Sequence, residues 1–224
     1  MVGDSAEVIG NSAGGETLRA YGGEDGDSRV ARRRATLIDA ALELLGASDG
    51  GSITVRGVCR EAGLTTRYFY ESFGSIEELV GATFDEVIGE ISERGLAGFA
   101  GGADMTGMVT GAVGAIIDVV AEDRRKGRLL FSQSLQSPTI AAKRMESTDI
   151  FAGLTLQSAS GILDVELGPE ALAAANFQVG GFARVIAAWL DGHLDLDRDG
   201  LVEISVRLMT ALADGVGHAG PTSA

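Results

Sequence analysis

Residues 52–80 read SITVRGVCREAGLTTRYFYESFGSIEELV, and this stretch decides the fold. Ser52 or Thr54 can begin a short helix whose apolar residues face inward, and Gly63 ends it. A second short helix follows after one or two turn residues, with Thr65 placed to cap its N-terminus. Two short helices joined by a glycine-containing turn predict a helix-turn-helix.

Helical spacing continues on both sides of this motif. Apolar residues recur with the helical period across 29–51, where glycines end the pattern. Downstream, Ser75 followed three residues later by Glu78 is typical of a capping box at the start of a helix over 75–100. Further helices are predicted near 104–122, 124–136, 138–163, 169–192 and 198–216, the third of them interrupted around Gly153. No alternation of Val, Ile and Thr is long enough for a sheet, so the sequence predicts an all-α protein.

The distribution of charge keeps nucleic acid open as a partner. The 224 residues carry a formal net charge of −14, which by itself argues against DNA. Residues 29–75, however, hold seven arginines against five acids, a net charge of +2, whereas the flanking segments are acidic. Because salt screens charges beyond about 8–10 Å, partner binding depends on this local balance.

Composition also indicates the cellular compartment. Cys59 is the only cysteine, so no internal disulfide is possible, and this fits a reducing cytosol. No basic-then-apolar leader opens the chain, and the apolar window 108–120 is too short to span a bilayer. We therefore expect a cytoplasmic protein without a membrane partner. Residues 1–28 and 219–224 are predicted to be disordered tails.

Two segments resemble a known family. TLIDAALELL at 36–45, together with the stretch at 52–80, closely resembles the DNA-binding domain of the TetR family of transcriptional repressors. DRRKGRLLF, SPTIAAKR and AAWLDGHL look like later segments of its actinobacterial members. The resemblance implies an all-helical homodimer with about nine helices per subunit. It implies a three-helix, helix-turn-helix DNA-binding domain over 29–74 and a ligand-binding and dimerisation bundle over 75–218. A double-stranded DNA operator and an unidentified small-molecule effector are the implied partners.

The resemblance also assigns candidate DNA-contacting residues to the matched positions. It implies a second helix at 54–62 and a recognition helix at about 65–71, with Phe69 and Phe73 in core positions. Arg67 is the candidate for base readout, because a guanidinium can bond guanine O6 and N7 at once. The other candidates are Thr54 for a phosphate, Thr65, Thr66 and Tyr68 at the front of the recognition helix, Tyr70 for the DNA backbone, and a basic arm of Arg32, Arg33 and Arg34.

Two positions depart from the family pattern. Members often have Tyr or His where this chain has Ser72, and Lys where it has Ile76. Loss of the lysine removes a charged phosphate contact, so we expect a shallow salt dependence unless the basic arm compensates. An alternative function therefore stays open: a helical module that binds a ligand or protein and whose DNA binding is weakened or lost.

Catalytic constellations are missing from the sequence. His193 and His218 are the only histidines, and both are far along the chain from Cys59. The segment DLDRDG at 195–200 echoes a calcium loop, but the glutamate that closes such a loop is absent. No phosphate-cradling glycine loop and no nucleophile elbow appears. We expect neither an enzyme nor a bound cofactor or metal.

The later helices supply candidates for a ligand cavity and a dimer interface. The candidate cavity residues are Met105, Met108, Ile116, Phe131, Phe151, Phe177 and Trp189. The acidic C-terminal part offers only Arg128, Arg144 and Arg184 to pair with an anion, so the sequence favours an apolar or weakly cationic effector. Residues 169–216 carry more apolar surface than one packing face needs, which predicts a two-fold dimer and a pseudo-palindromic operator.

The family resemblance further implies a moving element. Ligand in the bundle would shift the helix over 75–95, and with it the spacing of the two recognition helices in the dimer. Gly81 and Gly89 are candidates to make this helix pliable.

Overall fold

The structure is a computed structural model that describes residues 24–47, 53–132, 137–163 and 168–217. Within these ranges the chain forms nine α-helices and no strand. Their bounds are α1 Glu24–Leu45, α2 Val55–Glu61, α3 Thr66–Ser72, α4 Ile76–Ala100, α5 Met105–Glu122, α6 Arg124–Phe131, α7 Pro138–Leu163, α8 Pro169–Leu190 and α9 Arg198–Gly217. The predicted all-α class is confirmed.

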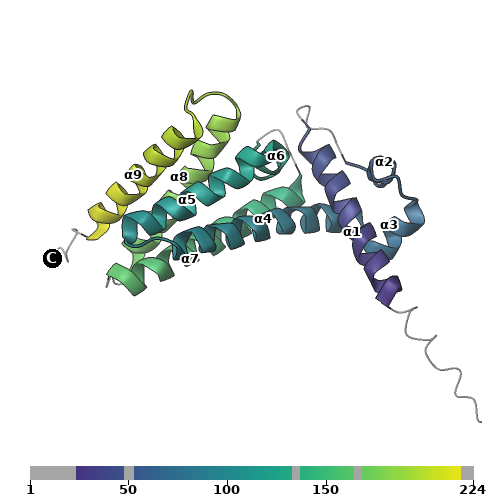
Figure 1. Ribbon diagram of the computed structural model, residues 1–224, viewed down its shortest axis with the longest axis horizontal. Helices are drawn as coiled ribbons and strands as arrows, with labels where there is room; N and C mark the ends of the chain where they lie inside the picture. The colour runs from purple at the N-terminus through teal and green to yellow at the C-terminus, as the bar shows by residue number, and fades with distance from the viewer. Residues whose placement is uncertain (1–23, 48–52, 133–136, 164–167, 218–224) are drawn as a thin grey trace, which may run out of the picture.

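The helices form two parts joined by α4 (Figure 1). At one end α2 and α3 lie beside α1, and α4 runs from them into the remaining helices. There α5 packs along α4, and α8 and α9 lie side by side at the end that also holds the last described residues. The small three-helix part is thereby held at one end of a longer bundle.

Short polar side chains begin the helices where the sequence indicated. The Thr54 hydroxyl accepts from the backbone N–H of Gly57 at 3.1 Å, so Thr54 caps α2. The Ser75 hydroxyl accepts from the N–H of Glu78 at 3.1 Å, as the predicted capping box requires. The Glu78 carboxylate reaches back to the N–H of Gly74 at 2.7 Å. Between α2 and α3, Gly63 has a φ of 64°, a left-handed turn that favours glycine.

Several predicted boundaries were wrong. The first helix begins at Glu24, so residues 24–28 belong to α1 and not to a tail; acidic residues in a first helical turn interact favourably with the helix dipole. The remaining predicted tail residues lie outside the described ranges. Helix α6 ends at Phe131, well before 136. Helix α7 runs without interruption through Gly153, because one glycine costs only about 1 kcal/mol against alanine.

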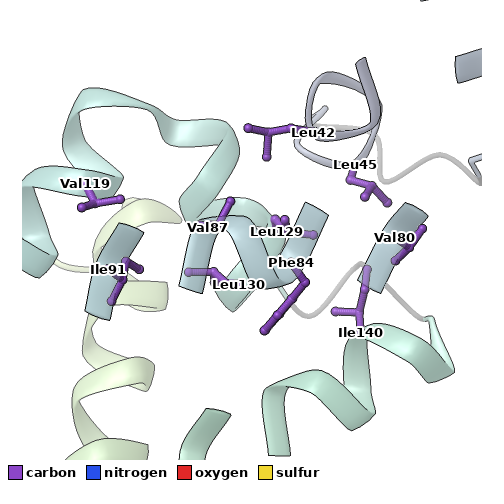
Figure 2. Close-up of a cluster of buried hydrophobic side chains, with 10 residues drawn as sticks. All are labelled: Leu42, Leu45, Val80, Phe84, Val87, Ile91, Val119, Leu129, Leu130 and Ile140. Carbon is purple, nitrogen blue, oxygen red and sulfur yellow. The ribbon is translucent and has the colours of Figure 1, made fainter. Parts of the chain in front are cut away.

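Three apolar clusters hold the helices together. The first closes the three-helix part and includes Leu37, Val58, Phe69 and Phe73. The second joins that part to the bundle: Figure 2 shows Leu42 and Leu45 of α1 near side chains of α4 and α6. Its buried members are Leu42, Leu45, Val80, Phe84, Val87, Ile91, Val119, Leu129, Leu130 and Ile140. The third cluster packs α5 against α9. Because the second cluster spans both parts, a movement of α4 or α6 would change the packing of α1.

Helices α4 and α5 approach most closely at a pair of glycines. A Cβ on Gly98 would lie 2.3 Å from the carbonyl oxygen of Gly111, and a Cβ on Gly111 would lie 2.2 Å from that of Gly98. Neither position can carry a side chain unless the two backbones separate. The bidentate ion pair of Arg94 with Glu122, at 2.6 and 2.8 Å, joins the same two helices on the outside.

Two helices, Met105–Glu122 and Pro169–Leu190, are long and apolar enough to cross a membrane by length and composition alone. Helix α5 packs on α4, α6 and α9, which accounts for its apolar character. Helix α8 leaves Leu172 and Phe177 exposed, by 51% and 72%. The fold of one chain therefore does not cover all the apolar surface of α8.

Candidate nucleic-acid interface and ligand cavity

Helix α3 divides its aromatic residues between the core and the surface. Phe69 and Phe73 are 0% and 2% exposed and anchor the helix against α1 and α2. Tyr70, the next residue, is 63% exposed, and its ring meets that of Phe69 edge-on. A seven-residue helix is held by these two buried rings, so the side chains on its outer face are free to meet a partner.

Arg67 projects from the outer face of α3 with 84% of its side chain exposed. Its Nε donates to Oε1 of Glu71, one helical turn on, at 3.0 Å. This bond uses the Nε–H of the guanidinium. The two terminal nitrogens are the pair that would grip guanine O6 and N7.

The basic N-terminal arm predicted from the sequence lies on α1 beside α3. The Arg33 guanidinium stacks on the ring of Tyr68, 3.9 Å from its centroid, and also contacts the Glu71 carboxylate at 3.6 Å. The Arg34 guanidinium lies 4.7 Å from the centre of the Phe73 ring. Arg32 is exposed. The structure therefore brings the arginines of α1 and the outer face of α3 to one surface, which the sequence alone did not establish.

The predicted threonines occupy two kinds of position. Thr54 is exposed and its hydroxyl oxygen is engaged by the Gly57 N–H, while its hydroxyl hydrogen can still donate. Thr65 and Thr66 are exposed at the start of α3. Thr65 is the N-cap residue of α3, as predicted, but its side chain makes no capping hydrogen bond; its carbonyl accepts from the N–H groups of Tyr68 and Phe69.

Ile76, where the family pattern often has a lysine, is partly buried against the core of the three-helix part. An ammonium group would have to leave that apolar contact to reach a phosphate. The isoleucine thus contributes to packing at the junction of α3 and α4, and Ser72 beside it is half-buried.

A cavity of about 650 Å³ lies inside the bundle, between α4, α5, α7, α8 and α9, with the end of α6 at its wall. Small-molecule sites are typically about 300–1,000 Å³, so its size suits an organic ligand. Of the residues predicted from the sequence, Met105, Ile116, Phe131 and Phe151 line this cavity. Residues at the wall that the sequence did not single out include Ile91, Leu96, Phe99, Val109 and Leu154.

The other three predicted cavity residues lie elsewhere. Phe177 points out of the bundle and is 72% exposed. Trp189 packs on the α5–α9 cluster, and its indole N–H donates to the carbonyl of Leu196 at 2.8 Å. Met108 does not line the cavity but lies where α5 passes Gly102. Periodicity identifies apolar faces of a helix, yet it does not say which face meets a cavity, a core or a partner.

Two arginines of the described ranges, Arg144 and Arg184, lie in the cavity wall. The Arg144 Nη2 donates to the carbonyls of Leu129 and Ser132, at 2.9 and 2.7 Å, at the end of α6. Arg128, the third arginine considered from the sequence, points instead to the first part of the chain, where its Nη1 donates to the Gly46 carbonyl at 3.0 Å.

Helix α6 is also tied to α1 by ion pairs. The Arg125 guanidinium bonds Glu43 at 2.9 Å and Asp39 at 3.4 Å, both on α1. It also bonds Asp123, the residue that caps α6, and this bond lowers the pKa of the Asp123 carboxyl. A Cβ on Gly46 would lie 2.6 Å from Arg125 Cβ, so the end of α1 fits tightly against α6. The cavity wall and the three-helix part are therefore connected through one short helix.

The acidic segment at 195–200 has a structural role. Asp197 caps α9, its carboxylate accepting from the Gly200 N–H at 2.8 Å. Arg198 forms a bidentate pair with Asp118 of α5, at 2.6 and 2.9 Å, and this bond lowers the pKa of the Asp118 carboxyl. Across the described ranges, no group of three or more His, Cys, Asp or Glu side chains is arranged to hold a metal ion.

The chain is similar to known regulators in sequence at one end and in fold over most of its length. Residues 37–83 match the family model described as bacterial regulatory proteins, tetR family. No curated protein matches the whole sequence at a significant level. The fatty acid degradation regulator FadR from Bacillus halodurans is 17% identical, with a TM-score of 0.67 over 82% of this chain and 96% of that one.

Two further solved structures resemble the fold. FadR from Bacillus subtilis, in complex with stearoyl-CoA, is 19% identical with a TM-score of 0.62 over 81% of this chain and 98% of its own. A TetR-like transcriptional regulator from Rhodococcus sp. RHA1 is 19% identical with a TM-score of 0.63 over 85% and 98%. All three are described as regulators. Residues 37–83 thus match the model of the tetR family of bacterial regulatory proteins, and the chain shares its fold with these solved regulators.

Proposed function

We propose that this protein represses transcription by binding a pseudo-palindromic DNA operator, and that a small molecule in the bundle releases it. The observation that carries the proposal is the outer face of α3. There Arg67 is exposed above two buried phenylalanines, and the arginines of α1 lie alongside. A surface of this kind fits a recognition helix in the major groove, with the arm near phosphates.

Dimerisation through about 169–216 is part of the proposal. Exposed apolar side chains on the last two helices, Leu172, Phe177 and Leu208, support it, since they have no cover within one chain. Gly180 and Gly181 of α8 have open space where a Cβ would stand, so a second copy can approach the backbone closely. A two-fold dimer presents two recognition helices, which accounts for a palindromic operator.

The cavity supports the effector part of the proposal. Its walls come from α4 and from α6, and both helices contact α1. A ligand that binds one position of these helices more tightly than another shifts the spacing of the recognition helices. The FadR structure that holds stearoyl-CoA has a similar fold, which favours a lipid-like effector here. We expect the regulator to act in the cytoplasm.

Binding to the DNA upstream of its own gene tests the proposal. Fluorescence anisotropy should give a dissociation constant that rises with salt, because each phosphate contact adds about 0.9 to the logarithmic salt slope. Arg67→Ala should reduce discrimination between this DNA and a scrambled duplex, by about 1–3 kcal/mol for a lost bidentate base contact. The matched control is Arg124→Ala, which removes one exposed positive charge on α6, away from α3.

The alternative, a helical binding module that no longer reads DNA, makes the opposite prediction. Under it, the chain binds the upstream and scrambled duplexes alike, and Arg67→Ala changes nothing that Arg124→Ala does not change. Replacing Arg32, Arg33 and Arg34 together by Ala examines the basic arm separately. An unchanged salt slope in that variant would remove the arm from the DNA contacts.

A further inference from the structure

Among the described residues of the cavity wall, Arg144 is the one whose side chain has a buried nitrogen without a hydrogen-bond partner. Its Nη2 is engaged by two carbonyl oxygens at the end of α6, while its Nε is shielded from solvent and donates to nothing among the described residues. A shielded donor without an acceptor is costly, and such a group in a native structure calls for an explanation.

The charge of Arg144 is also uncompensated. Within the described part of the chain it forms no ion pair, whereas Arg94, Arg125 and Arg198 each meet carboxylates. Burial lowers the pKa of the Arg144 guanidinium, and no neighbouring acid opposes that change. Buried charges in proteins are normally paired. Because the Nε atom itself is shielded, a further partner for this charge has to meet the rest of the guanidinium from the cavity.

The rest of the cavity suits an extended apolar body. Along α7 the wall runs from Arg144 to Ser158, about 21 Å at the helical rise per residue. Apolar side chains of α4 and α5, such as Ile91, Phe99 and Val109, face it over much of that length. The wall hydroxyls of Thr148 and Thr155 donate to their own helix, so they offer no competing donors to a ligand.

We propose that the cavity binds an amphipathic acid, an extended hydrocarbon chain with one anionic head, and that the head lies against the guanidinium of Arg144. This inference rests on the proposed function, since it names the class of effector. It reverses the expectation of an apolar or weakly cationic effector. That expectation counted acids and bases over the whole domain, whereas the cavity environment depends on which of them reach its wall.

The other charged residues of the wall, Arg184 and Asp214, are exposed to water. Water screens an exposed charge, so a head group beside Arg184 gains little from it. Arg184 is therefore the matched control for Arg144: it belongs to the same wall and has the same chemistry, but it lies in a different solvent environment.

The anionic head has two possible sources. A free fatty acid supplies a carboxylate, and an acyl thioester of CoA supplies phosphates. Both place a chain in the cavity and negative oxygens at a guanidinium. Four probes with the same twelve-carbon chain separate them: dodecanoate, dodecanoyl-CoA, dodecanol and dodecylammonium.

Calorimetric titration of the full chain with each probe, below its micellar concentration, tests the proposal. The wild type should bind dodecanoate or dodecanoyl-CoA about ten- to a hundredfold more tightly than dodecanol, the size of effect that a hydrogen bond to a charged group produces. Arg144→Gln should abolish this preference, Arg144→Lys should retain most of it, and Arg184→Gln should leave it intact. Circular dichroism checks that each variant folds.

The pattern of losses identifies the head. If Arg144→Gln weakens only dodecanoate the head is a carboxylate, and if it weakens only dodecanoyl-CoA the head is a phosphate. Equal affinity of the wild type for all four probes, no binding of any of them, or tighter binding of dodecylammonium overturns the proposal. So does an unchanged preference in Arg144→Gln or, should that variant not fold, a lost preference in Arg144→Lys. Because no DNA is present, failure to find an operator would refute the proposed function without altering these results.

Discussion

Replacing Gly98 by alanine tests how closely α4 and α5 pack, and with it the geometry of the helix that joins the two parts. The new Cβ would lie 2.3 Å from the Gly111 carbonyl oxygen and 2.6 Å from its carbon. Ordinary contact begins about 1 Å farther out. Both obstructing atoms belong to the backbone, so a side-chain rotation cannot relieve them and the helices must separate.

Gly89→Ala is the matched control, because it makes the same substitution in the same helix where no atom lies within 4 Å of the added Cβ. Alanine in a helix interior is favoured over glycine by about 1 kcal/mol. Gly89→Ala should therefore stabilise the protein by up to that amount. Gly98→Ala gains the same propensity but loses about 1–3 kcal/mol to overpacking.

The two variants should thus differ in stability by about 1–3 kcal/mol, which corresponds to a difference in melting temperature of about 2–12 °C for a chain of this size. Thermal unfolding followed by circular dichroism at one fixed protomer concentration measures it, because a dimer's stability depends on concentration. Equal melting temperatures would refute the close approach. Gly89→Ala also tests the pliability predicted for α4: full release of DNA by ligand in this variant would remove Gly89 from that role.

Four other substitutions examine particular contacts. Glu71→Gln should free Arg67 and remove a negative charge, which raises the affinity for non-specific DNA. The ratio of specific to non-specific affinity should fall about twofold, the size of effect of an exposed i,i+4 pair. An unchanged ratio in anisotropy titrations contradicts this. Arg128→Gln should keep ligand affinity by calorimetry but reduce ligand-induced release of DNA, because α6 loses its bond to the end of α1; release equal to wild type refutes the link. Asp123→Asn keeps the cap acceptor of α6 but loses the charge. The pKa of Asp123 is lowered by Arg125 in the folded state, so its stabilisation is present above the ordinary carboxyl pKa of about 3.9 and is lost as pH falls below it. Wild type should then be more stable than this variant at pH 7 and approach it near pH 3 in thermal melts; a constant difference counts against the ion pair. Phe177→Glu should give a monomer by analytical ultracentrifugation where wild type is a dimer, and a dimeric variant would exclude that face of α8.

The sequence predicted the fold well where local chemistry decides it. Thr54 and Ser75 mark two helix starts, Pro169 stands at the start of α8, and a glycine with positive φ turns the chain between α2 and α3. These signals act within a few residues and can be read without tertiary structure. The sequence prediction missed the start of α1 because the Gly, Asp and Ser residues near its N-terminus have weak helix propensity.

The candidate sites were harder to predict where they depend on which helices meet. The resemblance placed Arg67 and Tyr70 on the recognition helix, but not the stacking of Arg33 on Tyr68 or the bond between Arg67 and Glu71. Among apolar residues, periodicity did not distinguish the cavity wall at Phe151 from the exposed Phe177. The buried, unpartnered Nε of Arg144 has no sequence signal, since it depends on where α7 places this side chain against the end of α6.

Selection of bound duplexes from a random DNA pool, with and without dodecanoate or dodecanoyl-CoA, tests operator binding and its release by ligand together. The wild-type chain should enrich a pseudo-palindromic sequence with half-sites about 34–36 Å apart, or a multiple of that spacing. Dodecanoate or dodecanoyl-CoA should abolish the enrichment, and Arg67→Ala should lose it without ligand. Recovery of no common sequence, or enrichment of the same sequence by Arg67→Ala, would contradict the proposed function.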